Sequence, residues 1–330
     1  MTVLARLKST TALIGRAVVG TAQGTALGVG LLGALLGGLP TDALAQTAPV
    51  AVLAAPAATP MAEGAGPALW VVKDADSIIY LFGTVHVLRP TTAWGSARVD
   101  AAFDSASEVW FEISNPDDQA AIMPLIQEHG MSPATPLSSL LTPAEVADLD
   151  AAARTIGASA AQLDPLRPWL AALSLSVAPL VKAGYDPASG VELVLKARAT
   201  AAGKPTHGLE SIDKQVRILA TLPDDVQLAF LRSTLEDFDN AVVQLDEMVG
   251  AWASGDVTAL DRVVVEDMKT GSPAVYEALL VRRNTDWADQ IQTLLAGSGT
   301  TFIAVGAAHL AGDDSVQELL ETRGVEVARD

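Results

Sequence analysis

Two stretches of this sequence repeat one short pattern, and they restrict the possible folds more than any other feature. Each is an apolar run that leads into a glycine, with a histidine three residues later: Gly83 and His86 in the first, Gly306 and His309 in the second. Such apolar runs predict buried strands, and a glycine past the end of a strand allows a sharp turn. Sites of α/β proteins form at the carboxyl edge of a parallel sheet. We therefore expect His86 and His309 to come together at that edge.

The order of the expected elements predicts an α/β fold with a central, mostly parallel sheet flanked by helices. Strands are expected at 68–72, 77–82, 108–113, 206–210 and 301–305, with an edge strand at 326–327. Residues 117–183 have a helical pattern interrupted by prolines, which we interpret as an embedded helical subdomain. Helix starts with capping boxes are expected at Thr142 and at Ser315. Nothing indicates a second independent domain.

The N-terminal region is typical of an export signal. Arg6, Lys8 and Arg16 precede an uncharged apolar segment at 17–39, and Ala43-Leu44-Ala45 matches a signal-peptidase site. We expect residues 1–45 to be a signal peptide, 46–67 a flexible Ala- and Pro-rich leader, and 68–330 the folded domain. The protein would then be periplasmic or extracellular, without stable membrane insertion after cleavage. The alternative is that the apolar segment remains as an N-terminal membrane anchor.

Charge and cysteine content exclude several classes of function. The chain has 21 Lys and Arg against 39 Asp and Glu, and loss of residues 1–45 would make the balance 18 against 38. Such an acidic surface repels nucleic acid, so no nucleic-acid partner is expected. The sequence contains no cysteine, which excludes disulfides, thiolate metal sites and thiol nucleophiles.

Paired histidines suit either metal binding or general-base catalysis, and a metal held by two histidines usually takes a carboxylate as well. Glu112 and Glu210 each stand at the end of an apolar strand and are the candidates for that carboxylate. Either could also be an ordinary exposed residue at a strand end. Glu192 lies on an expected helix, where a solvated position is the stronger interpretation.

Arg283 and Asn284 belong to an amphipathic helix just before the second histidine motif. Asn284 falls on the apolar stripe of that helix, so it needs a hydrogen-bond partner. Either it caps nearby backbone, or both residues reach the site, where Arg283 could stabilise developing negative charge. Of the other histidines, His207 could approach the site because it is close to Glu210, while His129 is expected to be an ordinary loop residue.

With these residues identified, the chain resembles the TraB/GumN family, which is related to the Tiki metalloproteases. The resemblance extends from about 68 to 328, and the paired Gly-x-x-His motifs together with the Arg-Asn-x-x-Trp helix are specific to the family. The matching segments are Ala68-Leu69-Trp70, Leu81–His86 with Pro90, Val99-Asp100, Gly208-Leu209-Glu210 with Gln215, Arg283-Asn284 with Trp287, and Phe302–Leu310 with Gly312.

The resemblance implies an erythromycin-esterase/ChaN-like fold. It also implies a divalent metal, manganese or cobalt in the Tiki branch, held by two motif histidines and an acidic residue. Carried over, these are His86, His309 and Glu112, with Glu210 as the second choice for the acid. The resemblance to Tiki proteins implies peptidase activity, whereas the related ChaN-like proteins bind haem iron.

Three hypotheses follow. The first is an exported metal-dependent hydrolase acting on a peptide or protein, in which His86, His309 and Glu112 hold the cation. Glu210 would be the general base, and Arg283 would stabilise the oxyanion. The second is a non-catalytic haem- or metal-binding protein of the cell envelope. The third, an envelope scaffold with a decayed site, is opposed by the presence of both motif histidines and both glutamates.

Overall fold

A computed structural model describes residues 59–115 and 118–330 of the chain. These residues contain a six-stranded sheet in the order β4-β3-β5-β2-β1-β6. The predicted α/β class with a mostly parallel sheet is confirmed, because the pairs β2–β5, β5–β3 and β3–β4 are parallel and only the pairs β1–β2 and β1–β6 are antiparallel. The strands are β1 Leu69–Lys73, β2 Ser77–Thr84, β3 Glu108–Ile113, β4 Thr206–Glu210, β5 Gly299–Gly306 and β6 Val327–Arg329.

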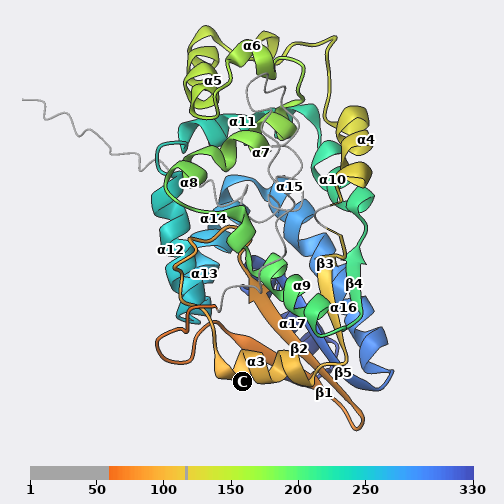
Figure 1. Cartoon of the computed structure of the whole chain (residues 1–330). Helices are drawn as coiled ribbons and strands as arrows, with labels where there is room; N and C mark the ends of the chain where they lie inside the picture. Colours follow the sequence, from red (N-terminus) through yellow and green to blue (C-terminus); the bar gives the residue numbers. More distant parts are fainter. Residues whose placement is uncertain (1–58, 116–117) are drawn as a thin grey trace, which may run out of the picture.

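The two histidine motifs lie on adjacent parallel strands, as the sequence repeat suggested. The last strand of the parallel block, β5, is inserted between β2 and β3 (Figure 1). The register is offset by one residue from the sequence repeat, because Thr84, not Gly83, pairs with Gly306. The end of β5 therefore has the end of β2 on one side and the end of β3 on the other.

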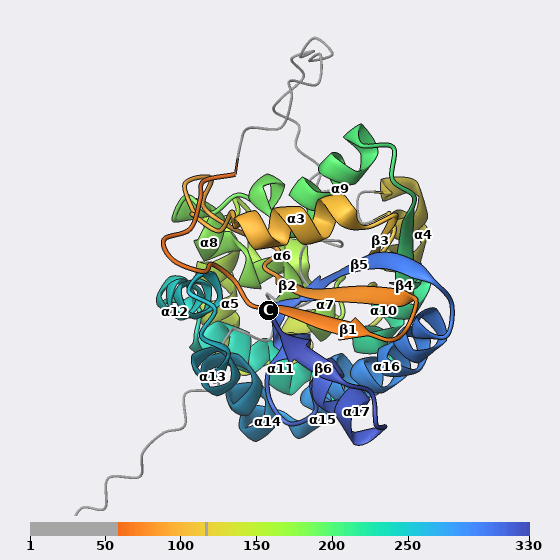
Figure 2. The same cartoon turned by 90° about the horizontal axis from the view of Figure 1, so that it is seen from below.

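Helices cover both faces of the sheet, and Figure 2 shows α3 (Ala97–Ser105) on one side with α16 (Arg282–Leu295) and α17 (Val316–Thr322) on the other. Alternation along the strands supplies an apolar set to each face. In β2, for example, Phe82 belongs to the core on the α3 side, while Ile79 and Leu81 pack in the core on the α16 side.

A second, helical layer lies beyond the carboxyl ends of the strands (Figure 1). Its central helix, α7 (Pro168–Ser176), is apolar on nearly all sides and almost wholly buried, which is typical of a helix inside a core. The predicted helix start at Thr142 is confirmed, since Thr142 and Glu145 form a complete capping box. The helices of residues 119–182 are α4 Gln119–His129, η1 Leu137–Leu140, α5 Pro143–Thr155, α6 Ala160–Leu163, α7 and α8 Ala178–Lys182.

The remaining helices connect the strands. They are η2 Pro187–Ser189, α9 Val191–Ala201, α10 Ile212–Ala220, α11 Asp224–Glu236, α12 Ala241–Ala253, α13 Val257–Leu260, η3 Asp261–Val265, α14 Glu266–Gly271, α15 Pro273–Tyr276, η4 Glu277–Val281 and η5 Ala307–Leu310. Two of them, η3 and η4, are π-helical turns. Such turns are rare and are often found at functional sites.

Two details differ from the sequence-based expectations. Ser315 does precede α17, but its side chain makes no capping bond and its Oγ has no partner among the described residues, so the capping box predicted there is wrong. Ordered contacts also begin before Ala68, because the backbone of Pro60 accepts hydrogen bonds from Trp94 and Gly95.

The expected signal peptide at 1–45, and the first part of the expected leader, lie outside the described residues. Within residues 59–115 and 118–330, no helix combines the length and the apolar character needed to cross a membrane.

Candidate active site

The four parallel strands bring the candidate residues to one edge of the sheet. Glu112 is the next-to-last residue of β3. Glu210 is the last residue of β4, and it pairs with Ile113, the residue after Glu112. His86 follows β2 by two residues, and His309 lies in η5 directly after β5. The site is thus at the carboxyl edge, where open α/β sheets bind ligands.

Arg283, on α16, contacts Glu112, Glu210 and His309. Its Nε lies 3.0 and 3.1 Å from the two carboxylate oxygens of Glu210, and its Nη2 donates to Glu112 Oε2 at 2.6 Å. Its Nη1 donates to the backbone oxygen of Leu279 at 3.2 Å and lies 3.0 Å from Nε2 of His309. The side chains of Glu112, Glu210 and His309 are almost fully buried.

The charge of Arg283 is maintained by its two carboxylate partners. Burial disfavours the guanidinium, but Glu112 and Glu210 more than compensate and raise the pKa of Arg283 above its ordinary value. A buried cation with two anionic partners is strongly coupled to both of them, so loss of any one member leaves an uncompensated charge in the interior.

His309 is completely buried and neutral. Its Nδ1 lies 2.5 Å from Oδ1 of Asn284, whose Nδ2 donates to the backbone oxygen of Asp314 at 2.7 Å. Since Asn284 must accept with Oδ1, Nδ1 of His309 carries the proton, and the free lone pair on Nε2 accepts from Arg283. Burial, together with the positive charge of Arg283 and the proximity of His86, holds the pKa of His309 well below its ordinary value.

His86 is held in a corresponding way by a different residue. Its Nδ1 lies 2.6 Å from Oε1 of Glu192, which also accepts a hydrogen bond from Thr84 Oγ1. The expectation of a solvated Glu192 is wrong, because its side chain is only 13% exposed. Burial opposes the negative charge of Glu192, but His86 and Thr84 outweigh it and lower the pKa of this carboxyl.

Gly306 marks the point at which these groups converge. A Cβ at Gly306 would lie 3.0 Å from Glu112 Oε1, 3.5 Å from Cδ2 of His309 and 3.7 Å from Nε2 of His86. The backbone N–H of Gly306 donates to Glu112 Oε1 at 2.8 Å, while Gln215 donates to Oε2 at 3.1 Å.

The two motif glycines are therefore needed for space and not for a sharp turn. The φ angle of Gly306 is −50°, and Gly83 has no positive φ either. At Gly83 a Cβ would lie 3.1 Å from Cα of Ala307, so any side chain would separate β2 from the segment that carries His309.

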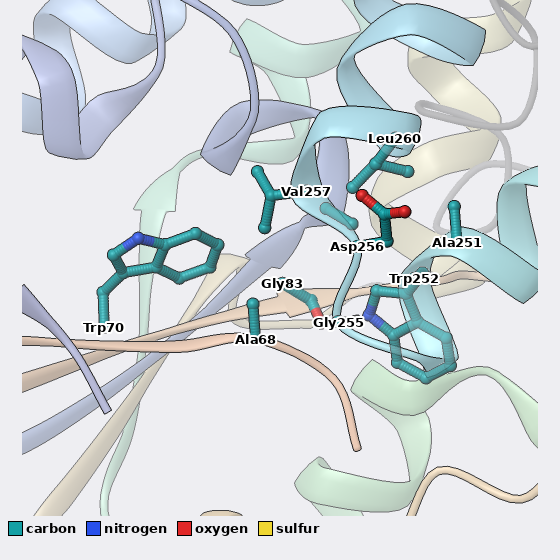
Figure 3. A pocket seen from close by; sticks show the side chains of 10 residues that line it. Ala68, Trp70, Gly83, Ala251, Trp252, Gly255, Asp256, Val257 and Leu260 are labelled. Carbon is teal, nitrogen blue, oxygen red and sulfur yellow. Dashed lines mark hydrogen bonds between the residues drawn. The ribbon is translucent and has the colours of Figure 1, made fainter. Parts of the chain in front are cut away.

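Aromatic rings form the walls of the site. The ring of Trp287 lies 4.3 Å from that of His309, and the guanidinium of Arg283 lies 4.6 Å from the centre of the same indole. Trp252 donates to the backbone oxygen of Gly83 at 2.8 Å and lines a small apolar pocket (Figure 3). Trp252 thus fixes the backbone that leads to His86.

The remaining histidines lie outside this centre. His207 is near the start of β4, where it stacks on Trp110 and pairs with Glu108 at 3.2 Å, so the idea that it could approach the site is wrong. His129 is the last residue of α4, so the loop position expected for it is wrong.

The donor set can be tested against a divalent cation. Glu112, Glu210 and Glu192 provide three carboxylates against the single guanidinium of Arg283, an excess of two negative charges when both imidazoles are neutral. A proton on His86 would remove one of these. Imidazole Nε2 atoms and a carboxylate are the ligand types that manganese, iron, cobalt and zinc accept. In donor type and charge, His86, His309 and Glu112 therefore fit such an ion.

The spacing of the donors is less favourable. In the part of the chain that the structure describes, no three His, Asp or Glu side chains are gathered closely enough to hold a metal ion. The reason is visible at His309, where Nε2 is bonded to Arg283 and lies 3.8 Å from Glu112 Oε1.

Sequence reasoning identified His86, His309, Glu112, Glu210 and Arg283 as site candidates, and the structure brings all five together. Sequence reasoning did not assign roles to Gln215, Thr84 or Glu192, which hold the others in place. For Asn284, both alternatives apply at once, because its amide nitrogen bonds backbone and its oxygen bonds His309. The apolar stripe position of Asn284 was the signal for this contact.

The chain has recognisable relatives among known proteins. The model of the TraB/PrgY/gumN family matches residues 68–329. An uncharacterized protein of Treponema pallidum (strain Nichols) is 25% identical over 289 residues, covering 80% of this chain and 86% of that protein. The uncharacterized protein YbaP of Escherichia coli K12 is 23% identical over 256 residues, covering 77% and 92%. No solved structure matches the chain.

Proposed function

Since this chain belongs to the TraB/PrgY/gumN family, we propose that it is an exported, metal-dependent hydrolase that acts on peptides. One observation carries the proposal: both motif histidines have Nδ1 bound by an acceptor side chain, so that both are disposed to use Nε2 at a shared centre with Glu112. Metal-binding histidines characteristically have their other ring nitrogen held in this way.

In this proposal His86, His309 and Glu112 hold a divalent cation, with manganese or cobalt favoured by the resemblance to Tiki proteins. Bound there, the cation would lower the pKa of a water molecule and so supply a nucleophile near neutral pH. The excess negative charge of the three glutamates supports the choice of a cation.

Arg283 is proposed to stabilise negative charge that develops on the substrate carbonyl oxygen. Its guanidinium is already oriented by Glu210, which contacts Nε with both oxygens. This arrangement favours a different role for Glu210 from the general base expected from sequence, because a carboxylate engaged with a guanidinium in this way holds Arg283 in position. Glu112 Oε1, which faces Gly306 and His309, is the better placed proton acceptor.

The peptide substrate and the erythromycin-esterase/ChaN-like fold are proposed on the resemblance. The four parallel strands with a site at their carboxyl edge are consistent with that fold. Export is proposed on the signal-like sequence of residues 1–45.

A non-catalytic metal-binding protein is the second candidate, favoured by the closure of the centre. Arg283, Glu112 and His309 are at most 4% exposed, so an ion can be enclosed there more readily than a peptide backbone. Haem fits this closed centre less well than a single ion does.

The test is hydrolysis of a peptide library by the purified protein with manganese or cobalt, before and after treatment with a chelator. We expect cleavage that is lost with the chelator and in His309→Ala, and retained in His207→Ala, a histidine of the same sheet outside the centre. Metal binding without any cleavage would favour the second candidate, and cleavage that persists in His309→Ala would contradict the proposal.

A further inference from the structure

We propose that Glu192 is a positioning residue that fixes the ring of His86, so that Nε2 faces Glu112 and Gly306. Nothing in the sequence pattern assigned a role to Glu192. Only the assignment of Nε2 as a metal ligand rests on the proposed function. The contact between Glu192 and His86 does not depend on it.

The contact has the geometry of an orienting pair. Oε1 of Glu192 lies 2.6 Å from Nδ1 of His86, and the two side chains are 13% and 12% exposed. A carboxylate accepts hydrogen bonds only, so Nδ1 of His86 must donate its proton to Glu192. The other ring nitrogen, Nε2, then lies 3.7 Å from the position of a Cβ on Gly306.

Thr84 restricts Glu192 from the other side. Its hydroxyl donates to the same oxygen of Glu192 that binds His86, and Thr84 is the last residue of β2. The carboxylate is therefore anchored to the strand that leads to the histidine. A flexible surface glutamate would not have its χ angles limited in this manner.

The backbone brings Glu192 to this position independently of its side chain. Glu192 is in the first turn of α9, and the N–H of Val191 donates to the backbone oxygen of Val85 at 3.0 Å. The N-cap residue, Gly190, is so close to the preceding motif that a Cβ there would lie 2.2 Å from the backbone oxygen of His86. The helix start is thus packed directly against the His86 segment.

The same ring atom is held in the second motif, but by an amide. Nδ1 of His309 donates to Oδ1 of Asn284, which comes from α16 on the opposite face of the sheet from α3. Two unrelated elements therefore fix the same tautomer in both histidines. This agreement directs Nε2 of both rings toward the centre and is not expected from a helix that merely places an acidic residue near its N-terminus.

The ring tautomer can be measured directly by ¹⁵N NMR of histidine-labelled, metal-free protein. At roughly pH 8.5, about two units above the ordinary imidazole pKa, the two ring nitrogens of a neutral histidine have distinct shifts. We expect His86 and His309 both to be protonated at Nδ1 in the unmodified chain. Protonation of His86 at Nε2 would overturn the proposal without any variant.

Glu192→Ala is the informative substitution, and Glu318→Ala is its matched control. Glu318 is also in the first turn of a helix, α17, but it is exposed, and among the described residues no hydrogen bond or ion pair joins it to a histidine. We expect Glu192→Ala to shift His86 toward a mixed or Nε2-protonated state while the His309 signal is unchanged. Glu318→Ala should leave both signals as they are. An unchanged His86 tautomer in Glu192→Ala would contradict the proposal.

Two further readouts separate this inference from the proposed function. Glu192→Gln keeps the size of the side chain and a weaker hydrogen-bond acceptor, so it should partly restore the Nδ1-protonated tautomer of His86. It also provides the test if the alanine variant does not fold. Metal affinity, measured by titration with manganese, should fall about 10- to 100-fold in Glu192→Ala. If the unmodified protein bound no metal at all, the hydrolase proposal would fail, while the tautomer result would still decide the role of Glu192.

Discussion

Nη1 of Arg283 lies 3.0 Å from Nε2 of His309, and both side chains are buried. A guanidinium can only donate, so this contact requires an unprotonated Nε2 and a neutral imidazole. The bond between Nδ1 of His309 and Asn284 gives the same tautomer independently. The centre is therefore a coupled unit, in which the state of His309 depends on Arg283 and that of Arg283 on the two glutamates.

Replacement of Arg283 by Met should destabilise the fold by about 3–5 kcal/mol, because Glu112 and Glu210 would be left as buried carboxylates without their cation. Arg283→Lys should also be strongly destabilising, since an ammonium cannot reproduce the guanidinium contacts with three side chains. Arg282→Met is the matched control one residue earlier, with a side chain that is 72% exposed and paired with Glu277. Its effect should stay within about 0.5 kcal/mol.

Urea unfolding of the three variants measures these differences. Similar free energies of unfolding for Arg283→Met and Arg282→Met would contradict the claim that Arg283 compensates the charges of Glu112 and Glu210.

Gly306→Ala should reduce the capacity of the centre to bind metal, because the added methyl group would occupy the point shared by Glu112, His86 and His309. The backbone angles of Gly306 are accessible to alanine, so the defect should appear in metal affinity more than in the fold. Gly250→Ala, on an exposed position of α12 with nothing within 4 Å of a new Cβ, should be neutral or stabilising by up to about 1 kcal/mol.

Metal titration by calorimetry, together with thermal unfolding, distinguishes the two alanine variants. Equal metal affinity in Gly306→Ala and the unmodified protein would show that the centre does not lie at Gly306.

Stability should fall as the pH decreases below about 6.5, the ordinary pKa of histidine. The pKa of His309 is lowered in the folded state, so in the window between its folded value and 6.5 the unfolded chain binds a proton that the folded chain does not. The His309 contribution to stability is thus present above 6.5 and lost progressively below it.

His309→Gln lacks this titration and should show a smaller decrease in free energy of unfolding between pH 7.5 and pH 5. Parallel pH profiles for the variant and the unmodified protein would indicate that His309 is not held neutral.

The sequence predicted the participants of the site better than the contacts between them. The strand at 206–210 coincides with β4, and the repeat of strand, glycine and histidine placed His86 and His309 on one edge because each pattern is local and complete in itself. Glu192 was misassigned because a first-turn glutamate usually faces solvent, and its partners are separated from it by about a hundred residues. No local pattern encodes such a pairing.

The offset in register was also hidden from the sequence. Alignment of the two motifs glycine on glycine would pair Gly83 with Gly306, whereas in the structure Thr84 pairs with Gly306 and Gly83 lies close to Ala307. The π-helical turn η4, which directly precedes the helix that carries Arg283, follows from no simple periodicity either.

The most direct test of a metal centre is the metal content of the purified protein, compared with that of a His86→Ala/His309→Ala double variant and a His207→Ala control. Elemental analysis after equilibration with manganese or cobalt should find about one ion per chain in the unmodified protein and in His207→Ala, and none in the double variant. Equal retention in the double variant, or no metal in any of the three proteins, would contradict the assignment of His86, His309 and Glu112 as its ligands.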